Sequence, residues 1–366
     1  MDSGLEGVIV AQTVLSESDD ARGTLVFRGH ALEEAVREYG YEGTVALLWE
    51  GFAGTGLSRD AVREALGKGR EKAFERLGAW LEAAKPLPLA EAVRLAIAFL
   101  PADSTPAEIL AAMPVAIAAL LRAARQHPPL PPDPDLATTA DLLRMIHGRP
   151  AAAPMAEALD TYFTCVLENG LSTASFAARV IASSGASLVS AVLGAYCAFE
   201  GPKHGGAPGP TLDMLDEIAA SGDIDGWIES RLAAGGRLFG FGHRVFRGGD
   251  PRAAAIGKAL ERLGAGAERL GFARNVERSV GSIFARLKPR STPLEPNVEI
   301  NAALLLDTVG IPREAFTPVF AAARGAGWLA HAMEQRSTGR LVRPSSRYVG
   351  PRPGSARSID TPPPLA

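Results

Sequence analysis

The sequence predicts an all-α protein with a short β-hairpin near its N-terminus. Apolar residues recur at spacings of three and four through most of the long segments, which is the period of a helix with one buried face. Alanine and leucine dominate the composition. Convincing strand character is confined to residues 7–15 and 23–26, and we expect these two segments to pair as a hairpin.

The starts and ends of several expected helices are marked by their residue types. Asp250 precedes Pro251, which places a capping side chain before a proline at the first helical position. Thr105 and Glu108 have the spacing of a capping box around Pro106. The expected helices cover residues 59–84, 89–99, 106–125, 155–168, 172–199, 251–263 and 312–335.

Prolines divide the remaining sequence. Residues 85–88 break the helical pattern, and we interpret the proline-rich run 128–134 as an exposed loop within a domain. The tail, residues 351–366, is rich in Pro, Ser and Arg. It is either disordered or an arm that lies across a partner subunit.

The bulk properties exclude several classes of function. A chain of 366 residues can bury a large core, and its net charge of −3 implies no general attraction to nucleic acid. Cys165 and Cys197 lie in apolar helical stretches and are interpreted as small buried hydrophobes in a reducing compartment. No signal peptide is visible, and apolar stretches such as 111–121 and 186–199 are too short or too rich in Ala and Ser to span a membrane. We expect a cytoplasmic protein.

Two histidines in glycine-rich turns are the strongest functional signal. His204 lies in Gly-Pro-Lys-His-Gly-Gly and His243 in Gly-Phe-Gly-His-Arg. Glycine permits close approaches that a side chain would block, so each imidazole is accessible to a ligand at the end of a stiff loop. Glu299 follows downstream in Pro-Asn-Val-Glu. Two imidazoles and a carboxylate are the groups that proton transfer requires.

These three motifs resemble those of the citrate synthase family, and further matches occur in the same order along nearly the whole chain. They include Gly-Phe-Gly-His-Arg-Val and, near the C-terminus, Gly-Trp-Leu-Ala-His. The matching segments are residues 4–10, 25–30, 47–51, 201–206, 240–245, 296–299, 316–320, 327–331 and 343–350. One short motif is weak evidence, whereas this many in order is strong.

The resemblance implies condensation of acetyl-CoA with oxaloacetate, followed by hydrolysis of the thioester to citrate and CoA, as in the tricarboxylic acid cycle. Glu299 would be the base that removes a methyl proton. His204 would donate to the enol oxygen, and His243 would be the acid at the oxaloacetate carbonyl. The chemistry needs no metal, and no permanently bound cofactor is expected, because the acyl-CoA is a substrate.

The resemblance also assigns the binding of the anionic substrates. Arg252, Arg324 and Arg343 would hold the carboxylates, since arginine suits bidentate recognition. Arg343 would come from the neighbouring subunit. Arg247, four residues after His243, resembles the basic residue near the CoA phosphates. Asn169 occupies the position of a histidine that binds oxaloacetate in the family.

By resemblance, the chain has two domains and forms a homodimer. The larger domain would comprise residues 1–204 and 310–366, and the smaller helical domain residues 205–309. The segment 172–199 carries many small residues, which let helix backbones approach closely. It is either buried within its own domain or part of the dimer interface, and the resemblance favours the interface.

Three positions depart from the family pattern, all in the expected substrate pocket. The carboxylate is normally Asp and is here Glu299, a histidine has become Asn169, and an asparagine has become Ser172. Asn169 can donate a hydrogen bond but cannot carry a positive charge. Three readings stay open: a citrate synthase, including a relative that uses propionyl-CoA; a condensing enzyme for another 2-oxo acid; or a silent paralogue that binds acyl-CoA or a protein.

Overall fold

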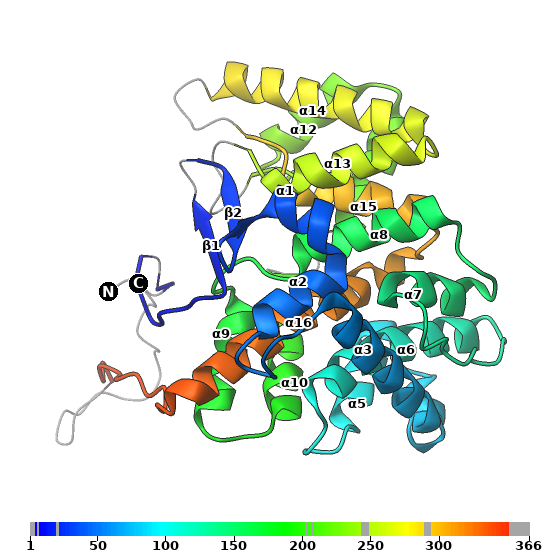
Figure 1. The fold of residues 1–366 in the computed structure, drawn as a ribbon. Coiled ribbons are helices and arrows are strands. Elements are labelled where there is room, and N and C mark those ends of the chain that lie inside the picture. Colours follow the sequence, from blue (N-terminus) through cyan, green and yellow to red (C-terminus); the bar gives the residue numbers. More distant parts are fainter. Residues whose placement is uncertain are drawn as a thin grey trace.

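The computed structural model describes residues 4–5, 7–19, 22–201, 204–205, 208–242, 249–288 and 294–350. It is mostly helical, with one small sheet near the N-terminus (Figure 1). The elements up to residue 166 are β1 (Ser16–Asp19), β2 (Thr24–Phe27), β3 (His30–Ala31), α1 (Leu32–Glu34), η1 (Ala35–Tyr39), α2 (Gly40–Trp49), α3 (Arg59–Glu75), η2 (Leu77–Ala79), α4 (Leu81–Ala84), α5 (Leu89–Ala98), α6 (Pro106–Ala124), α7 (Thr138–His147) and α8 (Ala153–Val166). The remaining elements are α9 (Thr173–Ser183), α10 (Leu188–Phe199), α11 (Pro208–Ser221), α12 (Ile224–Ala233), α13 (Pro251–Leu263), α14 (Ala267–Leu287), α15 (Val298–Thr308), η3 (Arg313–Ala315) and α16 (Phe316–Thr338).

Helix α16 is the centre of the larger group of helices. Nearly every residue that the structure describes in it, from Phe316 to Gln335, is buried. It packs against α9, α10, α6 and α8, which surround it (Figure 1). Helices α12, α13 and α14 lie at the opposite end of the molecule from α5 and α10. Helix α13 packs on α8 and α15, and α8 in turn packs on α16. Helix α13 is therefore connected through α8 to the larger group of helices.

The N-terminal sheet differs from its sequence-based prediction. The strand expected at residues 7–15 is wrong, because β1 begins at Ser16 and pairs antiparallel with β2, from Ser16 opposite Phe27 to Asp19 opposite Thr24. Most of the apolar residues that suggested a strand are exposed, with Ile9 88% exposed, although Leu15 is fully buried. A third strand, β3, adds to β2. The strand prediction failed because most of this apolar segment finds no surface of the described chain to pack against.

Two long expected helices are interrupted. The helix predicted over 172–199 is two helices, α9 and α10, which pack closely against each other across a turn at Gly185, where φ is +83°. The helix predicted over 59–84 ends at Glu75 and continues as η2 and α4. At Gly185 a glycine with positive φ ends α9 without steric cost, so the apolar period carries on into α10 while the helix axis changes.

Helix α6 is long and apolar enough to cross a membrane by length and composition, but most of it is buried inside the protein. The apolar stretch 111–121 within this helix was predicted to be too short to span a membrane. The burial of α6 is stronger evidence that it is a core helix. It packs against α3, α5, α7 and α16. Its start is the predicted capping box, in which Thr105 and Glu108 bond to each other's backbone N–H.

The two cysteines are not alike. Cys165 is fully buried, as predicted, and burial raises the pKa of its thiol above its ordinary range. Cys197, on α10, is exposed, so the prediction that it is buried was wrong. The helical period places it on the outer face of a helix whose other side, including Tyr196 and Phe199, is in the core.

Candidate active site

The turn after α10 holds His204 in a defined position. The backbone N–H of His204 donates to Gly201 O at 2.9 Å, and that of Gly205 donates to Phe199 O at 2.9 Å. A Cβ at Gly205 would collide with the Phe199 ring, so glycine is required there. Thr317, at the start of α16, donates its hydroxyl to Gly205 O at 3.2 Å. The turn is therefore tied to the central helix.

The contacts of His204 assign its tautomer. Its Nε2 accepts a hydrogen bond from the Ala174 backbone N–H at 3.3 Å, at the N-terminus of α9. An imidazole nitrogen that accepts carries no proton, so the proton is on Nδ1 and available to a ligand. Burial, together with the charge of Arg324, lowers the pKa of His204 to about 4. At neutral pH His204 is thus a neutral hydrogen-bond donor.

Glu299 lies at the N-terminus of α15, beside the loop that leads to His243. Asn297 caps the helix, accepting from the Glu299 N–H at 2.9 Å, and its side-chain amide donates to Gly242 O at 2.9 Å. Phe241 and Pro296 form an antiparallel bridge. A Cβ at Gly240, where φ is +79°, would collide with Ile300, so the close pairing of these segments needs glycine.

The carboxyl group of Glu299 is mostly buried. Burial raises its pKa above the ordinary value, while Arg237, the Gly240 backbone, Arg252 and Asn297 oppose the increase. Its Oε2 atom is buried and has no hydrogen-bond partner among the described residues. A carboxylate with a raised pKa and an unpaired oxygen is a stronger base than one on the surface.

Arg324 is a buried cation on α16. Its Nε donates to the Val166 carbonyl, and its guanidinium lies 5.2 Å from the centre of the Phe320 ring. Burial lowers the pKa of Arg324 to about 10, which leaves it charged at neutral pH. Its charge acts on His204 and Glu168, and the charge of Arg252 acts on Arg324 and Glu299. These groups therefore belong to one electrostatic cluster.

Arg252 is buried in the first turn of α13. Its Nε and Nη2 donate to the two carboxylate oxygens of Asp250 at 2.9 and 2.7 Å. Asp250 also accepts from the Arg252 backbone N–H, as the predicted cap, and from the Val298 N–H at 3.2 Å. Asp250 therefore holds Arg252 next to the start of α15, where Glu299 lies.

The turn between α8 and α9 carries two of the three departures from the family pattern. Asn169 is half-buried, and its Oδ1 is buried with no hydrogen-bond partner in the part of the chain that the structure describes. Ser172 caps α9, accepting from the Ser175 N–H at 3.2 Å. Ser172 thus has a structural role that the sequence analysis missed, although serine before an apolar helical run is a recognised cap signal.

A buried polar network supports the same turn. Ser16 Oγ donates to Glu168 Oε1 at 3.0 Å, and His331 Nε2 lies 3.1 Å from the same oxygen. Arg179 Nε donates to His331 Nδ1 at 3.0 Å, so the imidazole proton is on Nε2 and points to Glu168. Burial raises the pKa of Glu168, but His331, Arg324 and Ser16 outweigh it and hold the pKa below the ordinary value.

Not every predicted residue is placed with the others. Arg343 is exposed in the segment that follows α16, and no contact joins it to the cluster within the described ranges. His243 and Arg247 lie outside the residues that the structure describes. The structure therefore brings together His204, Glu299, Arg252 and Arg324, with Asn169 in the turn that precedes α9.

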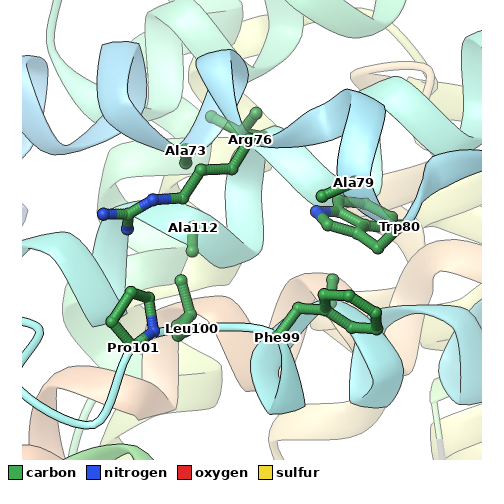
Figure 2. Close-up of a pocket in the computed structure, with 10 residues that line it drawn as sticks. Ala73, Arg76, Ala79, Trp80, Phe99, Leu100, Pro101 and Ala112 are labelled. Atoms are coloured by element: carbon green, nitrogen blue, oxygen red, sulfur yellow. The ribbon is translucent and has the colours of Figure 1, made fainter.

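A small pocket of about 80 Å³ lies elsewhere, among residues of α3, α5 and α6. Figure 2 shows the rings of Trp80 and Phe99 in its lining, with Arg76 extended nearby. Arg76 is the one charged side chain among its lining residues. The pocket holds neither histidine nor carboxylate, so it lacks the groups for proton transfer that the first site contains.

Comparison with known proteins defines the class. The family model for the citrate synthase C-terminal domain matches residues 4–345. The chain is 35% identical over 367 residues to citrate synthase of Haloferax volcanii, covering 95% of each protein. It is 30% identical over 365 residues to 2-methylcitrate synthase of Mycobacterium tuberculosis, covering 95% of this chain and 90% of that one. The crystal structure of citrate synthase from Thermotoga maritima superposes with a TM-score of 0.86 at 28% identity, over 99% of this chain and 98% of that one.

The relatives that these comparisons identify belong to a family of acyltransferases. The chain belongs to the citrate synthase family. The predicted fold class and family are confirmed.

Proposed function

We propose that the chain condenses acetyl-CoA with oxaloacetate to give citrate and CoA. The observation that carries this proposal is one electrostatic cluster that contains a neutral, half-buried His204 donor, the partly buried Glu299 carboxylate and two buried arginines, Arg252 and Arg324. A very weakly acidic methyl group next to a thioester needs both a base and a donor to the developing enol oxygen. The relative from Haloferax volcanii named citrate synthase supports the same reaction.

The residues divide the reaction into steps. Glu299 takes a proton from the acetyl methyl group, and His204 Nδ1–H hydrogen-bonds to the enol oxygen. The enol carbon then forms a bond to the ketone carbon of oxaloacetate, whose oxygen takes a proton from His243 and becomes a hydroxyl. Water hydrolyses the thioester of the product, which releases citrate and CoA.

Substrate binding follows from the arginines. Arg252 and Arg324 hold the carboxylates of oxaloacetate, assisted by Asn169, and Arg343 of a second copy completes the site. Arg247 binds near the CoA phosphates. We assign residues 205–309 to a smaller domain that closes over both substrates, and residues 1–204 and 310–366 to a larger domain.

A homodimer follows from the role of Arg343. Its exposure within the chain, together with exposed apolar residues such as Ile9 and Val349, supports a partner surface on this side. We place the protein in the cytoplasm and in the tricarboxylic acid cycle. Light scattering should report a dimer, and an active monomer would contradict the shared site.

The experiment that tests the proposed reaction is an assay of CoA release. Acetyl-CoA and propionyl-CoA are each paired with oxaloacetate and with a panel of other 2-oxo acids. We expect the highest turnover with acetyl-CoA and oxaloacetate. A preference for propionyl-CoA would instead match the relative named 2-methylcitrate synthase. Turnover only with another 2-oxo acid would redirect the assignment, and no turnover with any pair would favour a silent paralogue.

His204→Ala should lower turnover by about 100-fold or more, because it removes the donor to the enol oxygen. Folding should be little affected, since the His204 side chain makes one hydrogen bond among the described residues, to the backbone at the start of α9. His147→Ala is the matched control. His147 lies at the end of α7 and contacts the Val309 carbonyl, and it is not one of the proposed site residues. Turnover of the His147→Ala variant should therefore stay near normal. Near-normal turnover in His204→Ala would refute its assigned role.

A further inference from the structure

Tyr162 is a buried tyrosine whose hydroxyl has no hydrogen-bond partner among the residues that the structure describes. The two other fully buried tyrosines are satisfied: Tyr41 donates to Ala322 O at 3.4 Å, and Tyr196 donates to Ala90 O at 3.0 Å. A buried hydroxyl without a partner destabilises a fold, and buried polar groups in native proteins are nearly always bonded. An unsatisfied hydroxyl is therefore available to a partner beyond the described residues, such as a bound ligand.

The position of Tyr162 indicates which partner that is. Its ring packs edge-on against Phe320, with ring centres 6.3 Å apart. The guanidinium of Arg324 lies over the same Phe320 ring. Arg324 also donates to the carbonyl of Val166, which lies one helical turn beyond Tyr162 on α8. The phenol and Arg324 thus lie on one wall of the candidate active site.

The charges around Tyr162 agree with this placement. Burial raises the pKa of its hydroxyl far above the ordinary value, so it remains a donor at every relevant pH. Arg324, Arg252 and Glu299 all act on it electrostatically, and they come from α16, α13 and α15 respectively. The hydroxyl therefore lies within electrostatic range of both substrate-binding arginines and of the base.

We propose that the Tyr162 hydroxyl donates a hydrogen bond to a carboxylate oxygen of the 2-oxo acid held by Arg324. This inference rests on the proposed function and adds a binding residue to it. A neutral phenol donor beside Arg324 supplies part of the contact that Asn169, which cannot carry a positive charge, does not provide. A site built to bond a substrate through a buried donor leaves that donor unpaired when the substrate is absent.

Tyr162→Phe separates this role from a structural one, because it removes only the oxygen. We expect KM for oxaloacetate to rise by about 10-fold or more, as for loss of a hydrogen bond to a charged group. KM for acetyl-CoA should change by less than about 2-fold, since the phenol contacts the keto acid alone. Without ligand, the melting temperature should be unchanged or higher, because an unsatisfied hydroxyl is lost from the core.

Tyr196→Phe is the matched control, since its hydroxyl is bonded to Ala90 O within the chain. It should lower the melting temperature and leave both KM values unchanged. A Tyr162→Phe variant that keeps the wild-type KM for oxaloacetate would overturn the inference. So would a fall in melting temperature as large as that of Tyr196→Phe without a change in KM.

Failure of the proposed function has a different result from failure of this inference: the wild-type protein would release no CoA from any substrate pair. In that case calorimetric titration of wild type and Tyr162→Phe with oxaloacetate tests the inference alone. Weaker binding by Tyr162→Phe supports it. Equal binding by the two proteins, or no binding to wild type, overturns it.

Discussion

Replacing Arg70 with methionine is expected to destabilise the fold by about 3 kcal/mol, an amount typical of removing one partner of a buried ion pair. Both Arg70 and Asp141 have fully buried side chains, joined at 2.8 Å. The guanidinium also donates to the carbonyls of Asp133 and Leu136 at 3.1 and 2.8 Å. Arg70 therefore fastens the proline-rich loop, predicted at residues 128–134, to helix α3. Methionine keeps the volume of the stem and removes every one of these bonds.

Lys68→Met on the same helix provides the control. Lys68 pairs with Glu64, but both side chains are about two-thirds exposed, and such surface pairs contribute little. The free energy of unfolding of the Lys68→Met variant should differ from that of the wild type by less than about 0.5 kcal/mol. Urea unfolding measures both variants. Equal effects of the two substitutions would show that Arg70 does not hold the loop.

The fold class could be predicted because helical periodicity is a property of local sequence. The apolar period of residues 312–335 predicted the long helix observed as α16 (Phe316–Thr338), and the Asp250 and Thr105 caps gave two helix starts correctly. The strand at residues 7–15 could not be excluded locally. Whether an apolar segment is covered depends on which surfaces the folded chain, or a second copy, brings to it.

The candidate site was predicted from sequence motifs, and the structure adds the hydrogen-bond partners of the side chains in it. Sequence identified His204 as a donor, but its tautomer follows from the Ala174 N–H, which belongs to another helix. His331 was noticed only as part of a family motif, yet it links Glu168 to Arg179 inside the core. Tyr162 gave no sequence signal, since an isolated tyrosine on an apolar helix face is ordinary core. Its unsatisfied hydroxyl becomes visible only in three dimensions.

Substitution of Glu299 should have the largest effect on catalysis. Glu299→Gln preserves the shape of the side chain and removes the proposed base, so kcat should fall by about 100- to 10,000-fold. Folding should be unaffected or improved, because burial disfavours the charged carboxylate. The base acts when ionised, so activity in the wild type is present above the pKa of Glu299 and is lost as pH falls through it. Because that pKa is raised above its ordinary value of 4.5, the acid limb of kcat/KM should lie above pH 4.5.

Glu299→Asp distinguishes two explanations for the longer side chain. If the pocket has adjusted to Glu299, together with Asn169 and Ser172, shortening the side chain moves the carboxylate by about 1 Å and should lower turnover by about 100-fold. If the base is misaligned instead, the same change should raise turnover with oxaloacetate. We expect the loss. Ser172 already serves as the cap of α9, and the Gly240 backbone hydrogen-bonds to the Glu299 carboxyl, so the surroundings fit the residues that are present. Steady-state kinetics with acetyl-CoA and oxaloacetate decide between the two, and a gain in turnover would show that the base of this enzyme is held out of place.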